Sequence, residues 1–185
     1  STDGWKQNSN DEQGSVQTIE PGGVNPGEKA LHVKIERFTV WNTFNSAELK
    51  NSFPPGHTLV VLSAKGGPNT NQLAVECDEK DGSRWIAVIP LTAQWRRYII
   101  KPEDFKFWIS VPTRGQWGDK LNPENINRIS VGIAMTHTLA IPQGKNEYWV
   151  GYIGTAELNE ENKELLNAVN PPALDILCPG YKFYE

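Results

Sequence analysis

Apolar and β-branched residues recur along the chain in short runs, and clusters of Gly, Pro, Asn and Asp separate these runs. In the clearest run, residues 29–40, the apolar residues Leu31, Val33 and Ile35 alternate with polar ones. Because successive side chains of a strand point to opposite faces, this period of two predicts a strand with one buried and one solvated face. The same reasoning predicts strands near 14–19, 29–40, 58–64, 72–78, 83–90, 95–101, 128–136 and 147–155.

Turn residues indicate that neighbouring strands run antiparallel. Asp81-Gly82 lies between two strand runs, and this dipeptide favours the tight turn of a β-hairpin. Asn122 before Pro123 is typical of a helix start and predicts one helical turn before the strand near 128–136. Many short strands with turn signals between them are typical of a sandwich or barrel. We therefore expect an all-β, antiparallel fold.

The C-terminal part of the chain has a different pattern. Residues 156–169 are acidic and compatible with a helix, which Pro171-Pro172 would end. The residues that follow are too apolar for a disordered end, so they pack back on the sandwich or lead into a further domain. We therefore divide the chain into a β-sandwich over 1–155 and a short C-terminal helix and linker over 156–185.

Length and charge narrow the class of protein. A chain of 185 residues fits one domain and can bury a core without a metal or a disulfide. Its net charge of −4 argues against nucleic acid and against an anionic lipid surface as partners. The unusual feature of the composition is its tryptophan content, with seven Trp residues among 185.

Many of the aromatic residues fall in predicted connections. If antiparallel strands alternate in direction, connections 41–57, 79–82 and 102–127 share one end of the sandwich, while the other end consists of small and polar residues. The first end carries Trp41, Phe44, Phe53, Phe105, Phe107, Trp108 and Trp117. We therefore expect a ligand at this end.

Tryptophan on loops beside short polar residues is the composition that a sugar site needs. A flat indole covers the apolar C–H face of a pyranose ring, and Asp, Asn, Gln and Arg side chains bond the hydroxyls around its rim. We predict the ligand-binding residues Trp41, Asn42, Trp108, Arg114, Gln116, Trp117 and Asp119. In the alternative interpretation the aromatic residues plug the end of the core, which we expect for Phe53, Phe105 and Phe107. A sheet-face site that includes Trp85 or Trp149 also fits the sequence.

A run of motifs points to a known family. Residues 95–105 read W-x-x-Y-x-I-x-x-x-D-F, and they are followed by Leu-Asn-Pro-Glu-Asn-Ile at 121–126 and by a final strand at 147–153. This order resembles the galactose-binding-domain-like β-jelly rolls, which include many non-catalytic carbohydrate-binding modules of glycoside hydrolases. The resemblance covers about residues 25–155 and implies a jelly-roll sandwich. Many relatives hold a structural calcium ion near an Asp in the last strand, where this chain has Gly151, so we expect no metal and no cofactor.

Catalytic patterns are weak in this sequence. A glycosidase needs two carboxyl groups at a defined separation, and nothing places the candidates Glu36, Glu76 and Glu147 together. The histidines lie in no known catalytic motif. Cys77 and Cys178 are about a hundred residues apart, and we expect two separate thiols, with a disulfide in an oxidising compartment as the alternative.

The sequence as a whole favours a non-catalytic module that binds a polysaccharide or oligosaccharide, with a glycan and an adjoining catalytic domain as partners. Two alternatives remain open: a small jelly-roll polysaccharide hydrolase or lyase, and a structural domain that braces a catalytic neighbour. Because the chain starts with Ser1-Thr2 and carries no signal peptide, we expect a processed or excised piece whose targeting information is missing. We expect a secreted, periplasmic or cell-surface location.

Overall fold

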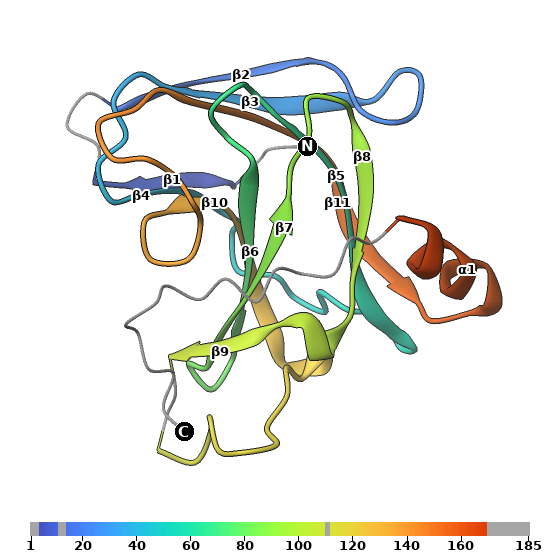
Figure 1. The fold of residues 1–185 in the computed structure, drawn as a ribbon. Coiled ribbons are helices and arrows are strands. Elements are labelled where there is room, and N and C mark those ends of the chain that lie inside the picture. Colours follow the sequence, from blue (N-terminus) through green and yellow to red (C-terminus); the bar gives the residue numbers. More distant parts are fainter. Residues whose placement is uncertain (1–3, 11–13, 110–111, 170–185) are drawn as a thin grey trace.

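Two antiparallel sheets form the protein in the computed structural model, which describes residues 4–10, 14–109 and 112–169 (Figure 1). Sheet A has the order β1-β4-β10-β6-β7-β9, and sheet B has the order β2-β3-β11-β5-β8. The strands of sheet A are β1 (Lys6–Ser9), β4 (Trp41–Asn45), β10 (Ile126–Ala134), β6 (Gln72–Glu79), β7 (Arg84–Pro90) and β9 (Lys106–Ile109). Those of sheet B are β2 (Ser15–Pro21), β3 (Lys29–Ile35), β11 (Asn146–Glu157), β5 (His57–Gly66) and β8 (Arg96–Ile100). Two 3-10 turns, η1 (Pro102–Asp104) and η2 (Pro123–Asn125), precede β9 and β10, and α1 (Glu160–Val169) follows β11.

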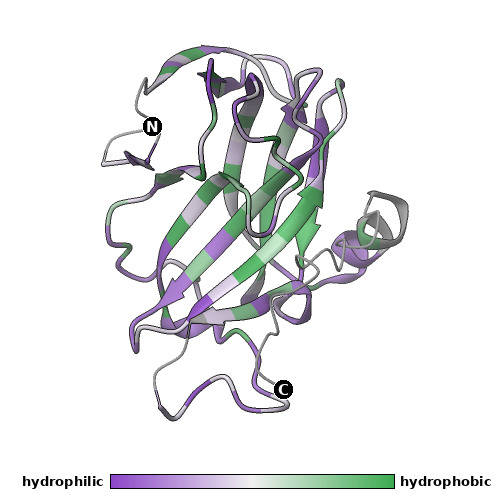
Figure 2. Cartoon of the chain, turned by 60° about the vertical axis from the view of Figure 1, so that its left-hand side comes forward, coloured by the Kyte–Doolittle hydropathy of each residue, from purple (hydrophilic) through white to green (hydrophobic). Residues whose placement is uncertain are grey.

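Alternation of side chains along the strands builds the core between the sheets. On β6, Leu73, Val75 and Cys77 join the main buried cluster, while Glu76 points to the opposite side. Figure 2 shows the alternation as bands of contrasting hydropathy along the strands. Trp85 of β7 is among the largest core side chains and is only 2% exposed. The residues that point away from this core form the outer face of sheet A and the outer face of sheet B. These two faces are the surfaces on which a ligand could bind.

Most of the predicted elements are confirmed. The predicted strands near 14–19, 58–64, 72–78, 83–90, 95–101, 128–136 and 147–155 correspond to β2, β5, β6, β7, β8, β10 and β11. The hairpin turn joins β6 and β7, with Gly82 at a φ of 89°. Asn122 precedes η2, and its side chain accepts a hydrogen bond from the Glu124 N–H. Phe53 and Phe105 are buried and Phe107 packs against the core, as the plug interpretation predicted.

The prediction of one strand over 29–40 is wrong, because β3 ends at Ile35. Beyond it, Phe38 remains fully buried, which preserved the apolar alternation in the sequence. Its backbone leaves the sheet, however: the Phe38 N–H donates to Gly144 O at 3.0 Å, and the Gln143 N–H donates to Phe38 O at 2.7 Å. The chain then enters the other sheet as β4, where the sequence pattern predicts a connection. The short strands β1 and β9 are not predicted by the sequence pattern either.

The C-terminal helix begins at Glu160, and β11 runs to Glu157. The apolar tail, Pro171-Pro172 and Cys178 lie outside the described residues, so the domain boundary after residue 155 stays a prediction. Cys77 is a buried, free thiol. Among the described residues, no helix has the length and apolar character needed to span a membrane.

Candidate functional site

The structure separates the predicted site residues into two regions. Trp41 pairs with Ala134 at the last position of β10, whereas Ile126 at its first position pairs with Glu79. Arg114 donates a hydrogen bond to that same Glu79. Since strand residues rise about 3.4 Å each, roughly 27 Å lies between the two ends of β10. The expectation that Trp41 and Trp117 share one end is therefore wrong, because the chain crosses the sheet as β4 directly after Trp41.

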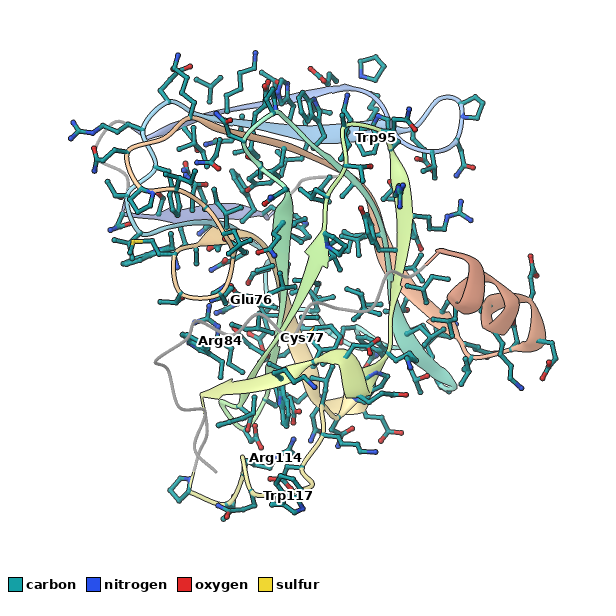
Figure 3. All side chains as sticks on the ribbon, viewed as in Figure 1. Glu76, Cys77, Arg84, Trp95, Arg114 and Trp117 are labelled. Carbon is teal, nitrogen blue, oxygen red and sulfur yellow. The ribbon has the colours of Figure 1, made fainter. Side chains whose placement is uncertain are left out.

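A buried ion pair holds the loop of residues 112–122 at the end of the molecule that lies at the bottom of Figure 3. The Arg114 Nη2 donates to Glu79 Oε1 at 2.9 Å and to Lys120 O at 3.0 Å. The Glu79 side chain is fully buried, and this burial raises its pKa above the ordinary value. The Arg114 guanidinium is therefore engaged within the protein.

A tight turn carries the other predicted residues of this loop. The Gln116 N–H donates to Asp119 Oδ2, and the Asp119 N–H donates to Gln116 O, each at 3.0 Å. Gly118 has a φ of 90°, which lets the chain reverse here. Trp117 lies at the tip of this turn and is completely exposed, so its ring adds no packing to the fold.

Trp41 and Asn42 begin β4 and point in opposite directions. Asn42 is fully buried on the core side, where its Nδ2 donates to Ser9 Oγ at 3.3 Å. It is therefore not available to a ligand. Trp41 lies on the outer face of sheet A, is 38% exposed, and donates from Nε1 to Asn8 Oδ1 at 3.4 Å. An indole in this position presents apolar area to solvent.

Trp108 lies on the same outer face of sheet A, in β9 rather than in the predicted loop. Its neighbour Phe107 pairs with Trp85 and packs on the core, so Trp108 points outward. There it packs against a small apolar cluster of Ala74, Ile86 and Val88. Because sheet strands are about 4.8 Å apart, the four steps from β4 to β9 put Trp108 roughly 19 Å across the sheet from Trp41.

A buried carboxylate supports Trp108 from below. The His137 ring meets the indole edge-on, with 5.3 Å between ring centroids, and His137 Nε2 lies 3.6 Å from Glu76 Oε1. On the other side, Arg84 Nε donates to Glu76 Oε2 at 2.8 Å. Burial opposes ionisation of Glu76, but contact with His137 and the charge of Arg84 outweigh it and hold the pKa of Glu76 below its ordinary value. The cluster therefore fixes an ionised carboxylate beneath the face.

Three charged side chains of this outer face remain partly exposed. Arg84, Asp78 and Arg128 are 32%, 30% and 46% exposed, respectively, and Asp78 lies within 4.0 Å of both arginines. Arg84 pairs with Asp78 across the β6–β7 hairpin, and Asp78 pairs with Arg128 across β6–β10, so the three form a row across the sheet. Such groups can donate to and accept from the hydroxyls of a ligand.

The loop of residues 135–141 is fastened onto the outer face of sheet A. The Leu139 N–H donates to Gln72 Oε1 at 2.8 Å, and the Thr138 hydroxyl donates to Ala134 O at 2.8 Å. Met135, next to Trp41 through its N–H bond to Val40 O, is 40% exposed. The loop extends the apolar surface between the two tryptophans.

The sequence analysis missed Asp78, Arg84, Arg128 and His137 as candidates. A signal for part of this set was present, because a hairpin at Asp81-Gly82 places Asp78 opposite Arg84. The approach of His137 depends on the path of the 135–141 loop, which no local pattern encodes.

The outer face of sheet B carries a second group of aromatic and charged side chains. His32 stacks on Trp149 with 4.2 Å between ring centroids, and Lys65 Nζ lies 4.2 Å from the Trp149 ring and 5.4 Å from the Trp95 ring. The His32 Nδ1 lies 3.0 Å from Glu20 Oε2. The Trp149 Nε1 donates to Glu20 Oε1 at 2.6 Å, and this bond is the main cause that holds the pKa of Glu20 below its ordinary value. Both faces of the Trp149 ring are therefore occupied.

The three carboxyl groups that are catalytic candidates do not all share one sheet. Glu76 is on the outer face of sheet A, and Glu147 is on the outer face of sheet B, bonded to His32 at 2.7 Å. Glu36 follows β3 and forms a 2.7 Å ion pair with Lys145. Glu76 and Glu147 therefore cannot form the facing pair that a glycosidase needs, because they belong to opposite sheets. Among the described residues, no three His, Cys, Asp or Glu side chains gather as metal ligands.

The fold matches solved structures of carbohydrate-binding modules. A family 11 carbohydrate-binding module from Clostridium thermocellum, in complex with a β-1,3-1,4-mixed-linked tetrasaccharide, superposes with a TM-score of 0.63 at 15% identity, covering 83% of this chain and 89% of the module. TmCBM61 in complex with β-1,4-galactotriose gives a TM-score of 0.50 at 12% identity, covering 84% of this chain and 89% of that one. The chain therefore has the β-sandwich fold of these modules, and the jelly-roll expectation is confirmed.

Larger proteins contain the same fold as one part. An exo-β-agarase matches 86% of this chain with a TM-score of 0.58 at 13% identity, but the match covers only 24% of the agarase. No protein-family model and no curated protein sequence matches the chain.

Proposed function

We propose that this protein is a non-catalytic module that binds an oligosaccharide or polysaccharide on the outer face of sheet A. The observation that carries the proposal is the placement of Trp41 and Trp108 on one outer face, which also carries the charged row of Asp78, Arg84 and Arg128. The indole rings supply flat apolar surface for sugar rings. The charged row supplies donors and acceptors for hydroxyls.

The separation of the two indoles favours an oligosaccharide over a single sugar. One ring cannot contact two tryptophans that are separated by four strand spacings, roughly 19 Å across the sheet alone. The ion pair of Glu76 with Arg84, together with the edge contact of His137, keeps Trp108 in a fixed orientation before any ligand arrives. A site fixed in this way loses little conformational entropy on binding.

The solved relatives support this proposal. Two structures with the same fold are complexes with a mixed-linked tetrasaccharide and a β-1,4-galactotriose. The match to about a quarter of an exo-β-agarase supports the further proposal that the module adjoins a catalytic domain. Because polysaccharides are met outside the cytoplasm, we also propose a secreted, periplasmic or cell-surface location.

Calorimetric titration with the mixed-linked tetrasaccharide, β-1,4-galactotriose and agarose oligosaccharides tests the proposal. For whichever ligand binds, Trp41→Ala and Trp108→Ala should each weaken binding by about 1–3 kcal/mol, or 5- to 150-fold, because alanine cannot replace the apolar area of the indole. Trp117→Ala, the same substitution off this face, is the matched control and should bind as the wild type does. Unchanged affinity in both face variants would contradict the proposed site.

A second measurement separates binding from catalysis. The protein should release no reducing ends and no unsaturated products from these polysaccharides, since the buried Glu76 of sheet A and Glu147 of sheet B lie on opposite faces. Product release that Glu76→Gln or Glu147→Gln abolishes would favour the hydrolase or lyase alternative. Absence of binding to every glycan in the panel would favour a domain that only braces a neighbour.

A further inference from the structure

A cavity of about 310 Å³ opens on the outer face of sheet B, away from the site proposed above. It is bordered by the 24–28 turn, by β5, β8 and β11, and by the start of α1. We propose that this cavity is a second saccharide site, which holds one pyranose unit of a neutral glycan. The inference extends the proposed glycan binding to the opposite face of the molecule, but it depends on different residues.

Tyr152 supplies an aromatic platform at the rim of this cavity. The side chain is 54% exposed, although it lines the cavity. A Cβ atom added to Gly154 would lie 2.1 Å from the Tyr152 hydroxyl oxygen and 2.5 Å from its ring carbon Cζ, so the phenol ring rests directly on the glycine backbone. One side of the ring is therefore supported, and the exposed remainder offers the flat surface on which a sugar ring stacks.

Ser63 supplies a buried polar atom without a partner. Its side chain lines the cavity and is only 1% exposed, and its Oγ accepts or donates no hydrogen bond. A Cβ atom on Gly151 would lie 2.4 Å from this oxygen, so only glycine leaves room for the hydroxyl. A buried hydroxyl without a hydrogen bond is unfavourable, and a ligand hydroxyl in the cavity would relieve this cost.

Arg97 adds a charged donor beside Ser63, because the two residues pair across β8 and β5. Among the described residues, no hydrogen bond or ion pair engages its guanidinium, and the Tyr152 hydroxyl is likewise unbonded. The fork of an arginine can donate to two neighbouring oxygens of a sugar at once. Three polar groups therefore line the same cavity, from Arg97, Ser63 and Tyr152.

Glu28 decides between a neutral and an acidic sugar. Its carboxylate accepts from the Val24 N–H at 2.9 Å and from Asn25 Nδ2 at 2.5 Å, so its own turn binds it. The bond from Asn25 is the main cause that holds the pKa of Glu28 below the ordinary value, and the charge of Arg97 adds to this. The cavity wall thus carries an anion near Arg97, which repels a second carboxylate and favours a neutral sugar.

A site-resolved NMR titration with the mixed-linked tetrasaccharide and with β-1,4-galactotriose tests this inference. The backbone amides of Ser63, Tyr152 and Gly154 report on the cavity, while the indole N–H signals of Trp41 and Trp108 report on the outer face of sheet A. With at least one of these probes, the cavity amides should shift in a saturable manner. Tyr152→Ala should weaken that response by about tenfold or more and leave the indole response unchanged. Leu158→Ala, another exposed apolar truncation just beyond β11, is the matched control.

The outcomes separate this inference from the proposed function. Shifts of the cavity amides without shifts of the two indoles support the second site and contradict the site on sheet A. Shifts of the indoles alone, or no cavity response to either neutral probe, overturn the second site. A cavity response to trigalacturonate but to neither neutral probe overturns the assignment of a neutral sugar. Ser63→Ala provides a further check, since it should weaken the cavity response without loss of the fold.

Discussion

Glu76 and Glu79 both belong to β6, and each is buried beside an arginine, yet their pKa values move in opposite directions. Glu76 points to the outer face of sheet A, where Arg84 and His137 approach it from two sides. Glu79 lies at the end of the strand, where Arg114 binds one oxygen and the other has no hydrogen bond. At Glu79 the effect of burial, which raises the pKa, exceeds the effect of the arginine, which lowers it. At Glu76 the contact with His137 and the charge of Arg84 together exceed the effect of burial.

The two ion pairs therefore serve different purposes. The pair at Glu79 ties the 112–122 loop to the body of the protein, because Arg114 and the Asn122 N–H both donate to the same oxygen. The pair at Glu76 leaves Arg84 partly exposed and supports Trp108 through His137. The cluster at Glu79 holds a loop in place, and the cluster at Glu76 supports a surface that can contact a ligand.

Loss of Arg114 should have the largest effect on stability. Arg114→Ala leaves the buried Glu79 carboxylate without its charged partner, which costs about 3–5 kcal/mol of unfolding free energy. Urea denaturation followed by tryptophan fluorescence measures this loss. Arg84→Ala is the matched change at the other cluster and should cost only about 1–3 kcal/mol, since His137 remains beside Glu76. Equal losses in the two variants would remove the distinction between the clusters.

The next effect concerns the backbone of the fastened loop. Gly115 has a φ of 81°, and a Cβ atom there would lie 2.6 Å from the Phe107 ring. Gly115→Ala should therefore cost about 2–3 kcal/mol, from backbone strain and from the clash together. Gly118→Ala is the control, because its φ is 90° but nothing lies within 4 Å, so the backbone alone should cost about 1–2 kcal/mol. Thermal unfolding of both variants measures the difference.

The sequence predicted the β-sandwich because period-two alternation and turn residues are local signals. It failed where local and non-local forces disagree. Residues 36–40 keep the alternation, since Phe38 is buried, but the backbone of Phe38 bonds to the loop at 143–144 instead of to a strand. Short β1 and β9, with four residues each, contain too few residues for a period to be recognised.

The site was predictable only in part for the same reason. Trp41 and Trp108 were predicted from their residue type, and they do share one face. Because strand β4 was not predicted, Trp117 was wrongly placed at the same end of the sandwich as Trp41. Asn42 was assigned to a loop, whereas as a strand residue next to Trp41 it must point to the opposite side. The support of Trp108 by Glu76 and His137 depends on chain segments that meet only in the folded protein.

The response to pH should distinguish the two glutamates by sign. Because the folded-state pKa of Glu76 is lowered, its ionisation stabilises the fold above the ordinary glutamate pKa, and this contribution is lost as the pH falls through the folded value. Because the folded-state pKa of Glu79 is raised, its contribution is present at low pH and is lost as the pH rises through the folded value.

Melting temperatures of Glu76→Gln and Glu79→Gln over a pH series measure these two signs. Relative to the wild type, Glu76→Gln should be destabilised most near neutral pH, and the difference should shrink as the pH falls below the ordinary glutamate value. Glu79→Gln should gain on the wild type as the pH rises above that value. If both variants follow the same trend, the opposite pKa directions are wrong.

The smallest effect on stability should come from Trp117. Its ring is fully exposed at the tip of the turn that Arg114 helps to hold, so Trp117→Ala should change the unfolding free energy by no more than about 0.5 kcal/mol. Trp108→Ala should cost more, about 1–3 kcal/mol, because its indole packs on Ala74, Ile86 and Val88. Denaturation and oligosaccharide titration of the two variants in parallel measure both effects. A loss of glycan affinity in Trp117→Ala, without any change in stability, would move the ligand toward the fastened loop and restore the site first inferred from the sequence.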